Sequence, residues 1–287
     1  MNCTKCPRNC NVNRQTQLGF CKASNKLKVA HVSLHFGEEP CISGSQGSGT
    51  IFFCYCNLRC VFCQNAIIRD GKLGKEIPAS HLAKIFKRLE DMGAHNINLV
   101  SPTQYAKQIV DALKIYRPKI PIVYNTNGYE SESTLDLLSE YVDVFLVDLK
   151  YFDNKLSSAL SSCPNYFYVA SRAIMKMRQL IPTDKWDNNL LVRGVIVRHL
   201  VLPGHTNDSL RVINFLAENL PTTTLSLMSQ FVPCDRAKEF GLDRTTKPIE
   251  YNKVLRYAMA KMKGEIFSQE ASSATCELVP NWDPKTV

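Results

Sequence analysis

Cys56-Asn-Leu-Arg-Cys60-Val-Phe-Cys63 is the stretch of sequence on which the fold and the chemistry of this chain depend. Its three thiols directly follow the apolar run Gly49-Thr-Ile-Phe-Phe-Cys-Tyr55. A run this short, rich in aromatic and β-branched residues and preceded by glycines, predicts a buried strand. The cysteines therefore lie on the loop at the C-terminal end of a strand, where α/β proteins place their chemistry.

The number of thiols on this loop indicates an open metal site. Four local cysteines would saturate a zinc ion or an iron–sulfur cluster. Three would leave one iron of a cubane without a protein ligand, free for a substrate or cofactor, as a catalytic zinc site keeps one position open. The alternative is three buried structural cysteines with an accidental spacing.

The CNLRCxxC form of this CxxxCxxC motif strongly resembles the radical SAM enzymes, and in particular homologues of pyruvate formate-lyase-activating enzyme. The match extends to the CPRxC leader at Cys6 and to the pattern LHxxEEPxISGxxGSGT from Leu34. The resemblance implies that Cys56, Cys60 and Cys63 hold a [4Fe–4S] cluster whose open iron binds S-adenosylmethionine. It also implies reductive cleavage of this cofactor to a 5′-deoxyadenosyl radical that abstracts hydrogen from a substrate.

The remainder of the chain alternates strands with helices. Beyond the strand at 49–55, the patterns predict strands at 96–100, 121–125, 143–148, 190–201 and 223–229, and helices at 78–93, 103–116, 131–140, 165–180, 207–219 and 248–263. Six strands alternating with helices imply a parallel sheet with right-handed crossovers. Periodicity does not choose between an open sheet and a barrel, whereas the family resemblance implies a partial (β/α)6 barrel.

The barrel accounts for residues 49–264 and leaves a small cysteine-rich N-terminal extension, 1–48, and a C-terminal tail, 265–287. Within the extension, residues 27–35 alternate like a half-buried strand, and 36–49 form a Gly/Ser-rich loop with no helical period. Glu38 and Glu39 on this loop could face the site, but such a pair is more often solvated. The tail is expected to be short and irregular.

Four further cysteines lie within the first 21 residues: Cys3, Cys6, Cys10 and Cys21. Their number suits a second metal, and both zinc and an iron–sulfur cluster fit the spacing. A short segment cannot fold on apolar burial alone, so a metal that holds it together is physically reasonable. The alternative is a frayed terminus with free thiols.

The predicted strand ends carry the other candidate site residues. The resemblance implies that S-adenosylmethionine is contacted by residues of the cysteine loop and of four strand ends: Phe62, Ser101, Thr103, Asn125, Asn127, Asp148, Lys150 and Arg198. Asp148 and Lys150 share one face of a strand, and Arg198 needs an anionic partner or water.

Two of these strand ends differ from the activases. Ser101-Pro-Thr replaces their Gly-Gly-Glu, and Asn125 replaces an aspartate that helps to hold a cation. Ser101 could equally cap the following helix, and Asn127-Gly could be an ordinary turn. Gln230 is a weaker candidate for a contact with adenine or ribose.

Several other residues are expected to be structural. These are the histidines His31, His35 and His199, the isolated cysteines Cys41, Cys163, Cys234 and Cys276, and also Cys54. Lone cysteines are usually small apolar core residues. Cys54 lies near the cluster loop, but we do not expect it to be a ligand.

Composition restricts the cellular setting. The chain has 287 residues, twelve cysteines and a formal net charge of +9. With neither a signal-peptide pattern nor a membrane-length apolar run, this cysteine content indicates metal or redox chemistry in a reducing cytoplasm. Basic residues are scattered, so a nucleic-acid partner is not favoured.

The sequence leaves three functions open. The first is a radical SAM oxidoreductase that activates a glycyl radical enzyme and receives electrons from a low-potential reductant such as flavodoxin or ferredoxin. The second is radical SAM modification of another protein, a peptide or a small metabolite. The third is a non-catalytic iron–sulfur electron carrier or interaction module, although a carrier would more often use four cysteines.

Overall fold

The computed structural model describes residues 3–269 and 280–287, and its centre is one mostly parallel sheet. The strands follow the order β10-β9-β8-β6-β5-β4-β2-β1-β3, in which β1 is Leu27–His35 and β3 is Lys75–Ile77. The parallel part comprises β2 (Ser48–Phe53), β4 (Ile97–Val100), β5 (Ile122–Thr126), β6 (Val144–Asp148), β8 (Leu190–Leu200), β9 (Thr224–Met228) and β10 (Ile266–Ser268). This arrangement confirms the predicted α/β class and is consistent with a partial radical SAM barrel.

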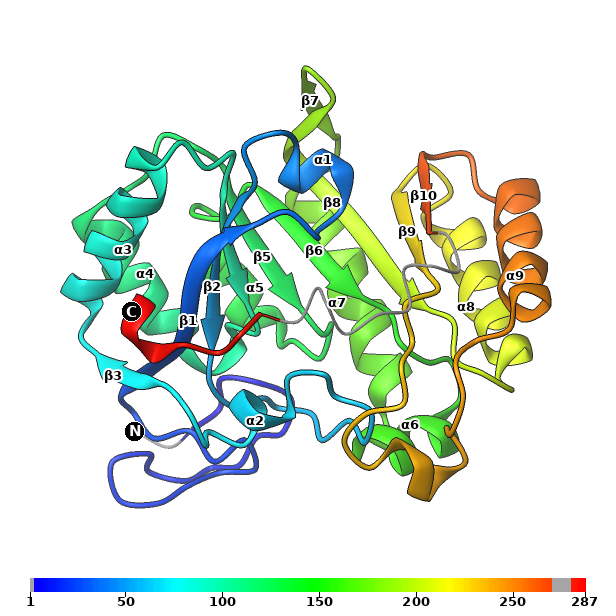
Figure 1. Ribbon diagram of the computed structural model, residues 1–287, viewed down its shortest axis with the longest axis horizontal. Coiled ribbons are helices and arrows are strands. Elements are labelled where there is room, and N and C mark those ends of the chain that lie inside the picture. The colour runs from blue at the N-terminus through cyan, green and yellow to red at the C-terminus, as the bar shows by residue number, and fades with distance from the viewer. Residues whose placement is uncertain (1–2, 270–279) are drawn as a thin grey trace.

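The predicted helices cover the outer face of the curved sheet (Figure 1). They are α3 (Ala79–Asp91), α4 (Ala106–Ile115), α5 (Glu132–Leu138), α7 (Tyr166–Leu180), α8 (Thr206–Asn219) and α9 (Pro248–Lys261). In α3, the apolar positions Leu82, Ile85, Phe86 and Leu89 are all buried, as their spacing predicts. Strands β4, β5, β6 and β9 are buried along their whole length because parallel sheets are covered on both faces.

Several short elements were missed or assigned wrongly. The helix α6 (Asn154–Ser161) contains three serines, which weaken the helical signal, and Asp153 caps it by accepting from the backbone N–H groups of Lys155 and Leu156. The tail was expected to be irregular, but β10 pairs with β9. Further short elements are α1 (Pro40–Ser43), within the predicted loop, α2 (Ala66–Arg69), β3 (Lys75–Ile77), β7 (Lys185–Asp187) and the 3₁₀ helix η2 (Ala237–Phe240).

The N-terminal extension is joined to the barrel. Strand β1 (Leu27–His35) pairs antiparallel with β2 and with β3, so the extension contributes to the same sheet. In the leader that precedes β1, the buried side chain of Arg14 donates to the backbone oxygens of Ala23, Ser24 and Gln104. The alternative of a frayed terminus is therefore wrong for the described part of the leader, which begins at Cys3.

The described C-terminal residues, 280–287, cross in front of β1 (Figure 1). The ring of Trp282 packs on Phe52 of β2 with centroids 5.1 Å apart. The hydroxyl of Thr286, in the 3₁₀ helix η4 (Pro284–Thr286), accepts from the N–H of Val32 at 3.0 Å. Cys276, predicted to be structural, lies outside the described residues.

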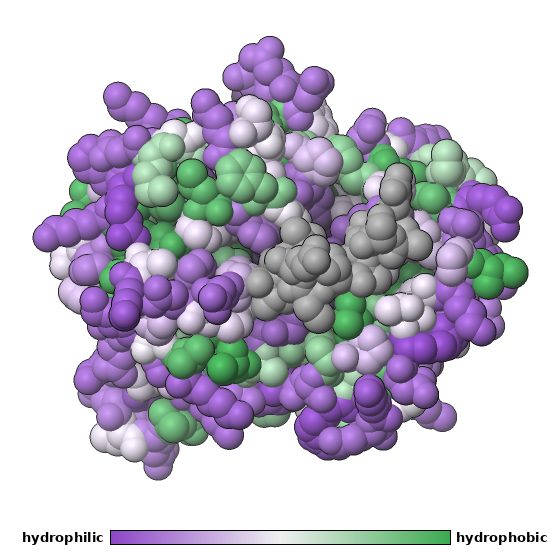
Figure 2. Space-filling view, in the orientation of Figure 1, coloured by the Kyte–Doolittle hydropathy of each residue, from purple (hydrophilic) through white to green (hydrophobic). Residues whose placement is uncertain are grey.

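Polar side chains dominate the face shown in Figure 2, where apolar side chains form only small groups. Within residues 3–269 and 280–287, no helix is both long and apolar enough to cross a membrane.

Candidate active site

The C-terminal ends of the parallel strands surround a cavity of about 270 Å³. Most of the predicted site residues line it: Cys56, Cys60, Phe62, Cys63, Ser101, Asn125, Asn127, Asp148, Lys150 and Arg198. The structure thus brings together side chains from the cysteine loop and from four different strand ends.

The cysteine loop is fixed on both sides. At its start, the side-chain amide of Gln104 donates to the backbone oxygens of Cys54 at 2.9 Å and Tyr55 at 3.1 Å. Tyr55 has a φ of +71°, an unfavourable conformation that this clamp helps to maintain. At the centre of the loop, the N–H groups of Arg59 and Val61 donate to carbonyls at the end of α6. Sequence reasoning missed Gln104 because nothing in its local pattern distinguishes it from a helix residue.

The sulfurs that line the cavity receive hydrogen bonds suited to thiolates. Cys56 Sγ accepts from Asn127 Nδ2 at 3.3 Å and from the N–H of Leu58 at 3.4 Å. Cys60 Sγ accepts from Ser161 Oγ at 3.0 Å. Burial raises the pKa of Cys56 to about 11, and the neighbouring Cys60 adds to the effect. As thiolates, the three half-buried cysteines would need a cationic group between them, and an iron–sulfur core fits this donor set.

The described residues contain no ready-made site for a single metal ion. Within the described ranges, no three His, Cys, Asp or Glu side chains converge closely enough to hold one metal ion. Cys56, Cys60 and Cys63 all line the cavity, and each cysteine would ligate a separate iron if a cluster is bound there. The leader thiols Cys3, Cys6, Cys10 and Cys21 do not surround one ion either, so a second metal there stays a prediction.

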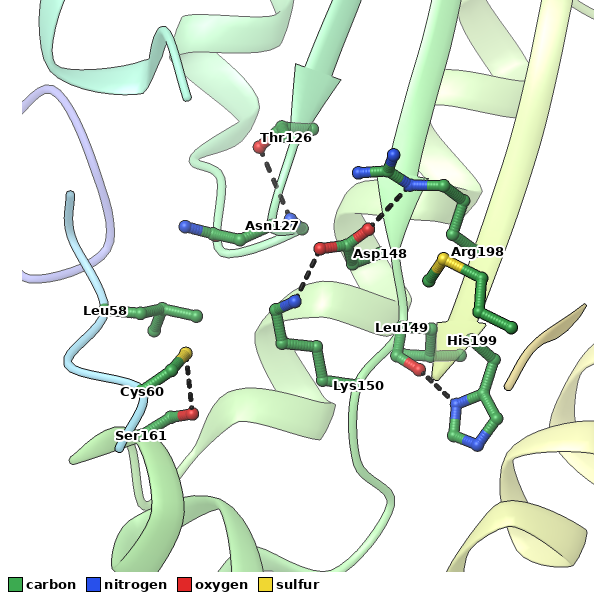
Figure 3. Close-up of polar contacts among 12 residues, drawn as sticks. Leu58, Cys60, Thr126, Asn127, Asp148, Leu149, Lys150, Ser161, Arg198 and His199 are labelled. Carbon is green, nitrogen blue, oxygen red and sulfur yellow. Dashed lines mark hydrogen bonds and ion pairs between the residues drawn. The ribbon is translucent and has the colours of Figure 1, made fainter. Parts of the chain in front are cut away.

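A buried ion network crosses the cavity wall (Figure 3). Asp148 lies between Lys150, whose Nζ is 2.5 Å from Oδ2, and Arg198, whose Nε is 2.8 Å from Oδ1. Burial opposes the charge of Asp148, but the two cations prevail and hold its pKa below the usual range. Burial also opposes the charge of Lys150, and Asp148 overcomes it to raise the pKa of the lysine. The predicted anionic partner of Arg198 is confirmed, and the side chains of Asp148 and Lys150 do meet, although β6 ends at Asp148 and Lys150 lies just beyond the strand.

Glu38 also belongs to this network, although a solvated loop was expected there. Its carboxylate lies 3.3 Å from Arg198 Nη1 and accepts from the side-chain amides of Asn98 at 3.1 Å and Asn125 at 3.3 Å. Burial raises the pKa of Glu38 to about 7, while Arg198 opposes the shift. The loop after β1 folds over the cavity, and this long-range placement has no local sequence signal.

The side chain of Asn125 is hydrogen-bonded to Arg198 and Glu38 of the same network. Its Oδ1 accepts from Arg198 Nη2 at 2.7 Å, where an activase has an aspartate beside a cation. A guanidinium thus already occupies the oxygen that a cation would need.

Two expectations about the end of β4 are wrong. Thr103 does not line the cavity, because its hydroxyl donates to the buried Glu130 at 2.5 Å. Ser101 does not cap the next helix. Pro102 occupies the cap position of the 3₁₀ helix η1 (Thr103–Tyr105), and Ser101 has a left-handed φ of +56° beside the cavity. A left-handed residue leaves the strand sharply, so the following residue turns away from the site.

Most of the histidines and cysteines that were expected to be structural do not line the cavity. His199 points away from the cavity, with its ring nitrogens on Leu149 O and Ser209 Oγ (Figure 3). Cys54 donates to Leu73 O outside the cavity. His35, in contrast, lines the cavity, as does the weaker candidate Gln230.

We predict that removing Arg198 destabilises the protein. Arg198→Ala would leave Asp148 and Glu38 without their shared cation in a buried place, which costs about 3–5 kcal/mol in the free energy of unfolding. The matched control is Arg193→Ala on the same strand, because Arg193 is 38% exposed and lies 3.8 Å from Asp143. The control should cost less than about 1 kcal/mol in urea unfolding. Equal losses of unfolding free energy in Arg198→Ala and Arg193→Ala would contradict a stabilising role for the buried ion network.

We also predict that the ionisation of Glu130 makes the stability of the protein depend on pH. Burial raises the pKa of Glu130 from 4.5 to about 7, although the three hydroxyls that donate to its Oε1 oppose this shift. Its contribution to stability is therefore complete below the pKa of the unfolded chain and is lost as the pH rises through about 7. Glu130→Gln, which mimics the protonated acid, should match the wild type near pH 5. Near pH 8.5 it should be ~3 kcal/mol more stable than the wild type in urea unfolding. An equal difference at both pH values would contradict this assignment.

Comparison with known proteins agrees with this geometry. The profile of the Radical SAM superfamily matches residues 50–216, more than half of the chain. The chain is 34% identical over 273 residues to an uncharacterised protein of Methanocaldococcus jannaschii. That match covers 90% of this chain and 74% of the relative.

Solved structures show the same fold at low identity. Streptococcus suis SuiB bound to the precursor peptide SuiA has a TM-score of 0.52 and 15% identity over 79% of this chain and 49% of that one. SuiB bound to S-adenosylmethionine has a TM-score of 0.52 and 14% identity over 75% and 48%. The hydrogenase maturase HydG of Carboxydothermus hydrogenoformans has a TM-score of 0.50 and 15% identity over 75% and 51%. The chain spans about half the length of these structures. On the profile match and the archaeal relative, the chain belongs to the radical SAM superfamily of enzymes, which implies a [4Fe–4S] cluster and S-adenosylmethionine.

Proposed function

We propose that this protein is an enzyme that abstracts hydrogen from a substrate with the help of a [4Fe–4S] cluster and S-adenosylmethionine. One observation carries the proposal: three cysteine sulfurs and a buried ion network line the same cavity. When bound, the cluster supplies the electron that cleaves S-adenosylmethionine to a 5′-deoxyadenosyl radical. Cys56, Cys60 and Cys63 would hold the cluster and leave one iron open.

The charged wall of the cavity would orient the cofactor. Asp148, Lys150 and Arg198 are already fixed by one another, so they can bind the charged groups of S-adenosylmethionine without being reordered. The side chains of Asn125 and Asn127 add amides at the same edge. Binding charge by preorganised partners in a place with little water is the contribution that a protein makes to cofactor chemistry.

Aromatic side chains close the cavity on another side. Phe62, between two of the cysteines, packs edge-on against Phe231 with centroids 5.8 Å apart. Both rings line the cavity, together with the apolar Leu58 and Met228. Such a wall excludes water, which supports a role in protecting a reactive intermediate from side reactions.

The substrate is a further proposal. Activation of a glycyl radical enzyme would carry over from the activases, but this chain replaces their Gly-Gly-Glu and their aspartate. In addition, Glu38 from the N-terminal extension borders the cavity. These departures favour modification of another protein, a peptide or a small metabolite over the activase substrate. Flavodoxin or ferredoxin is the proposed reductant.

A non-catalytic electron carrier is the competing function. A carrier gains nothing from burying four charged side chains beside its cluster, since burying charges is costly even when they are paired. Glu38, Asp148, Lys150 and Arg198 are 11–19% exposed, and this exposure faces the cavity. The network therefore supports a ligand-binding site.

The proposed function is tested by an assay for cleavage of S-adenosylmethionine in the absence of oxygen. We expect the reconstituted, dithionite-reduced protein to convert S-adenosylmethionine to 5′-deoxyadenosine, measured by liquid chromatography and mass spectrometry. Cys60→Ala should lose this product. Cys54→Ala should keep it, because Cys54 is buried nearby but does not line the cavity.

A reduced cluster in the wild type that yields no 5′-deoxyadenosine would contradict the enzyme and favour the carrier. If Cys54→Ala lost the product as completely as Cys60→Ala, the proposed ligand set would be wrong.

A further inference from the structure

Two buried hydroxyl groups form a hydrogen-bonded series that ends at the sulfur of Cys60, one of the proposed cluster ligands. Ser161 Oγ lies 3.0 Å from Cys60 Sγ, a contact drawn in Figure 3. Tyr151 OH lies 2.7 Å from the same serine oxygen. Both side chains belong to fully buried residues, so water does not compete for these contacts.

The number of available protons determines which group donates in each of these two hydrogen bonds. A cysteine that ligates iron is a thiolate and can only accept, so Ser161 donates its single proton to Cys60. The serine oxygen can then only accept from Tyr151, whose hydroxyl must be the donor. The result is a relay in which the tyrosine polarises the serine, and the serine hydrogen-bonds the sulfur.

The fold holds the relay in place. Ser161 is the last residue of α6, and its backbone oxygen accepts from the N–H of Arg59 at 3.1 Å. The oxygen of Leu160 accepts from the N–H of Val61 at 2.9 Å. These two bonds flank Cys60 and set the serine hydroxyl opposite its sulfur. On the other side, the ring of Tyr151 packs edge-on against Tyr166 with centroids 5.4 Å apart.

We propose that Ser161 and Tyr151 are positioning residues that raise the reduction potential of the cluster through Cys60. Reduction adds one negative charge to the cluster, and part of this charge resides on the ligating sulfurs. A donor aimed at a sulfur stabilises the reduced form more than the oxidised form, and burial strengthens the effect. The relay adds this stabilisation without adding a net charge, in contrast to the ammonium of Lys150 nearby. The inference rests on the proposed function, because it assumes that Cys60 ligates the cluster.

The experiment is a redox titration of the reconstituted full-length protein without S-adenosylmethionine. The EPR signal of the reduced cluster reports the midpoint potential. At a fixed poise, we expect Ser161→Ala to lower the ratio of reduced to oxidised cluster by about three- to tenfold, which is the effect of losing one hydrogen bond.

Ser157→Ala is the matched control. Ser157 lies on the same helix and is equally buried, but its hydroxyl donates to the backbone oxygen of Asn154 instead of to a sulfur. This variant should titrate like the wild type. Tyr151→Phe should shift the potential in the same direction as Ser161→Ala but less, because Ser161 keeps its bond to Cys60.

The outcomes separate this inference from the proposed function. Equal potentials for Ser161→Ala and Ser157→Ala would overturn the relay, even if the wild type cleaves S-adenosylmethionine. A shift in Ser161→Ala with none in Tyr151→Phe would overturn the part assigned to the tyrosine. A chain that takes up no cluster would contradict both proposals. In Ser161→Ala the buried hydroxyl of Tyr151 loses its partner, which could disturb the fold. The double variant Tyr151→Phe/Ser161→Ala removes both hydroxyls and so avoids this problem. If its midpoint potential shifts as much as that of Ser161→Ala, misfolding is excluded as the cause of the shift.

Discussion

Holding three cysteine side chains at one cavity is the constraint on which the rest of this structure depends. Thiolates repel one another, and burial alone disfavours their charge, as the raised pKa of Cys56 shows. The loop that carries them is therefore fixed from several sides, by Gln104 at its start and by the end of α6 at its centre. The leader adds Arg8, which donates to Asn57 O of the same loop at 2.9 Å.

The second constraint is electrostatic. Four charged side chains from the β1 loop and from two strand ends alternate in sign along the cavity wall, from Glu38 through Arg198 and Asp148 to Lys150. Each ion is neutralised by its neighbours, which makes their burial tolerable. A cofactor that carries both a carboxylate and an amino group meets partners of both signs. The sheet and the cysteine loop thus supply complementary parts of one site.

The sequence predicted the elements whose signal is local. The aromatic and β-branched run before Cys56 correctly predicted its strand, whereas the open metal site inferred from the three thiols stays a prediction. The same logic failed for Glu38, because a charged loop folds over a cavity only through long-range packing. It failed for Thr103, because one left-handed residue, Ser101, turns the chain away from the site. Helix α6 was hidden by its serines, yet one of them, Ser161, contacts a proposed ligand.

We propose that Cys56, Cys60 and Cys63 hold a cluster with one iron open to S-adenosylmethionine. Electron–nuclear double resonance of the reduced protein tests it most directly, with S-adenosylmethionine labelled at the amino nitrogen and the carboxylate oxygens of its methionine part. We expect hyperfine coupling between the labelled atoms and the cluster, and no such coupling in Cys60→Ala. A cluster signal that is unchanged by S-adenosylmethionine, with no coupling to either label, would contradict the proposal.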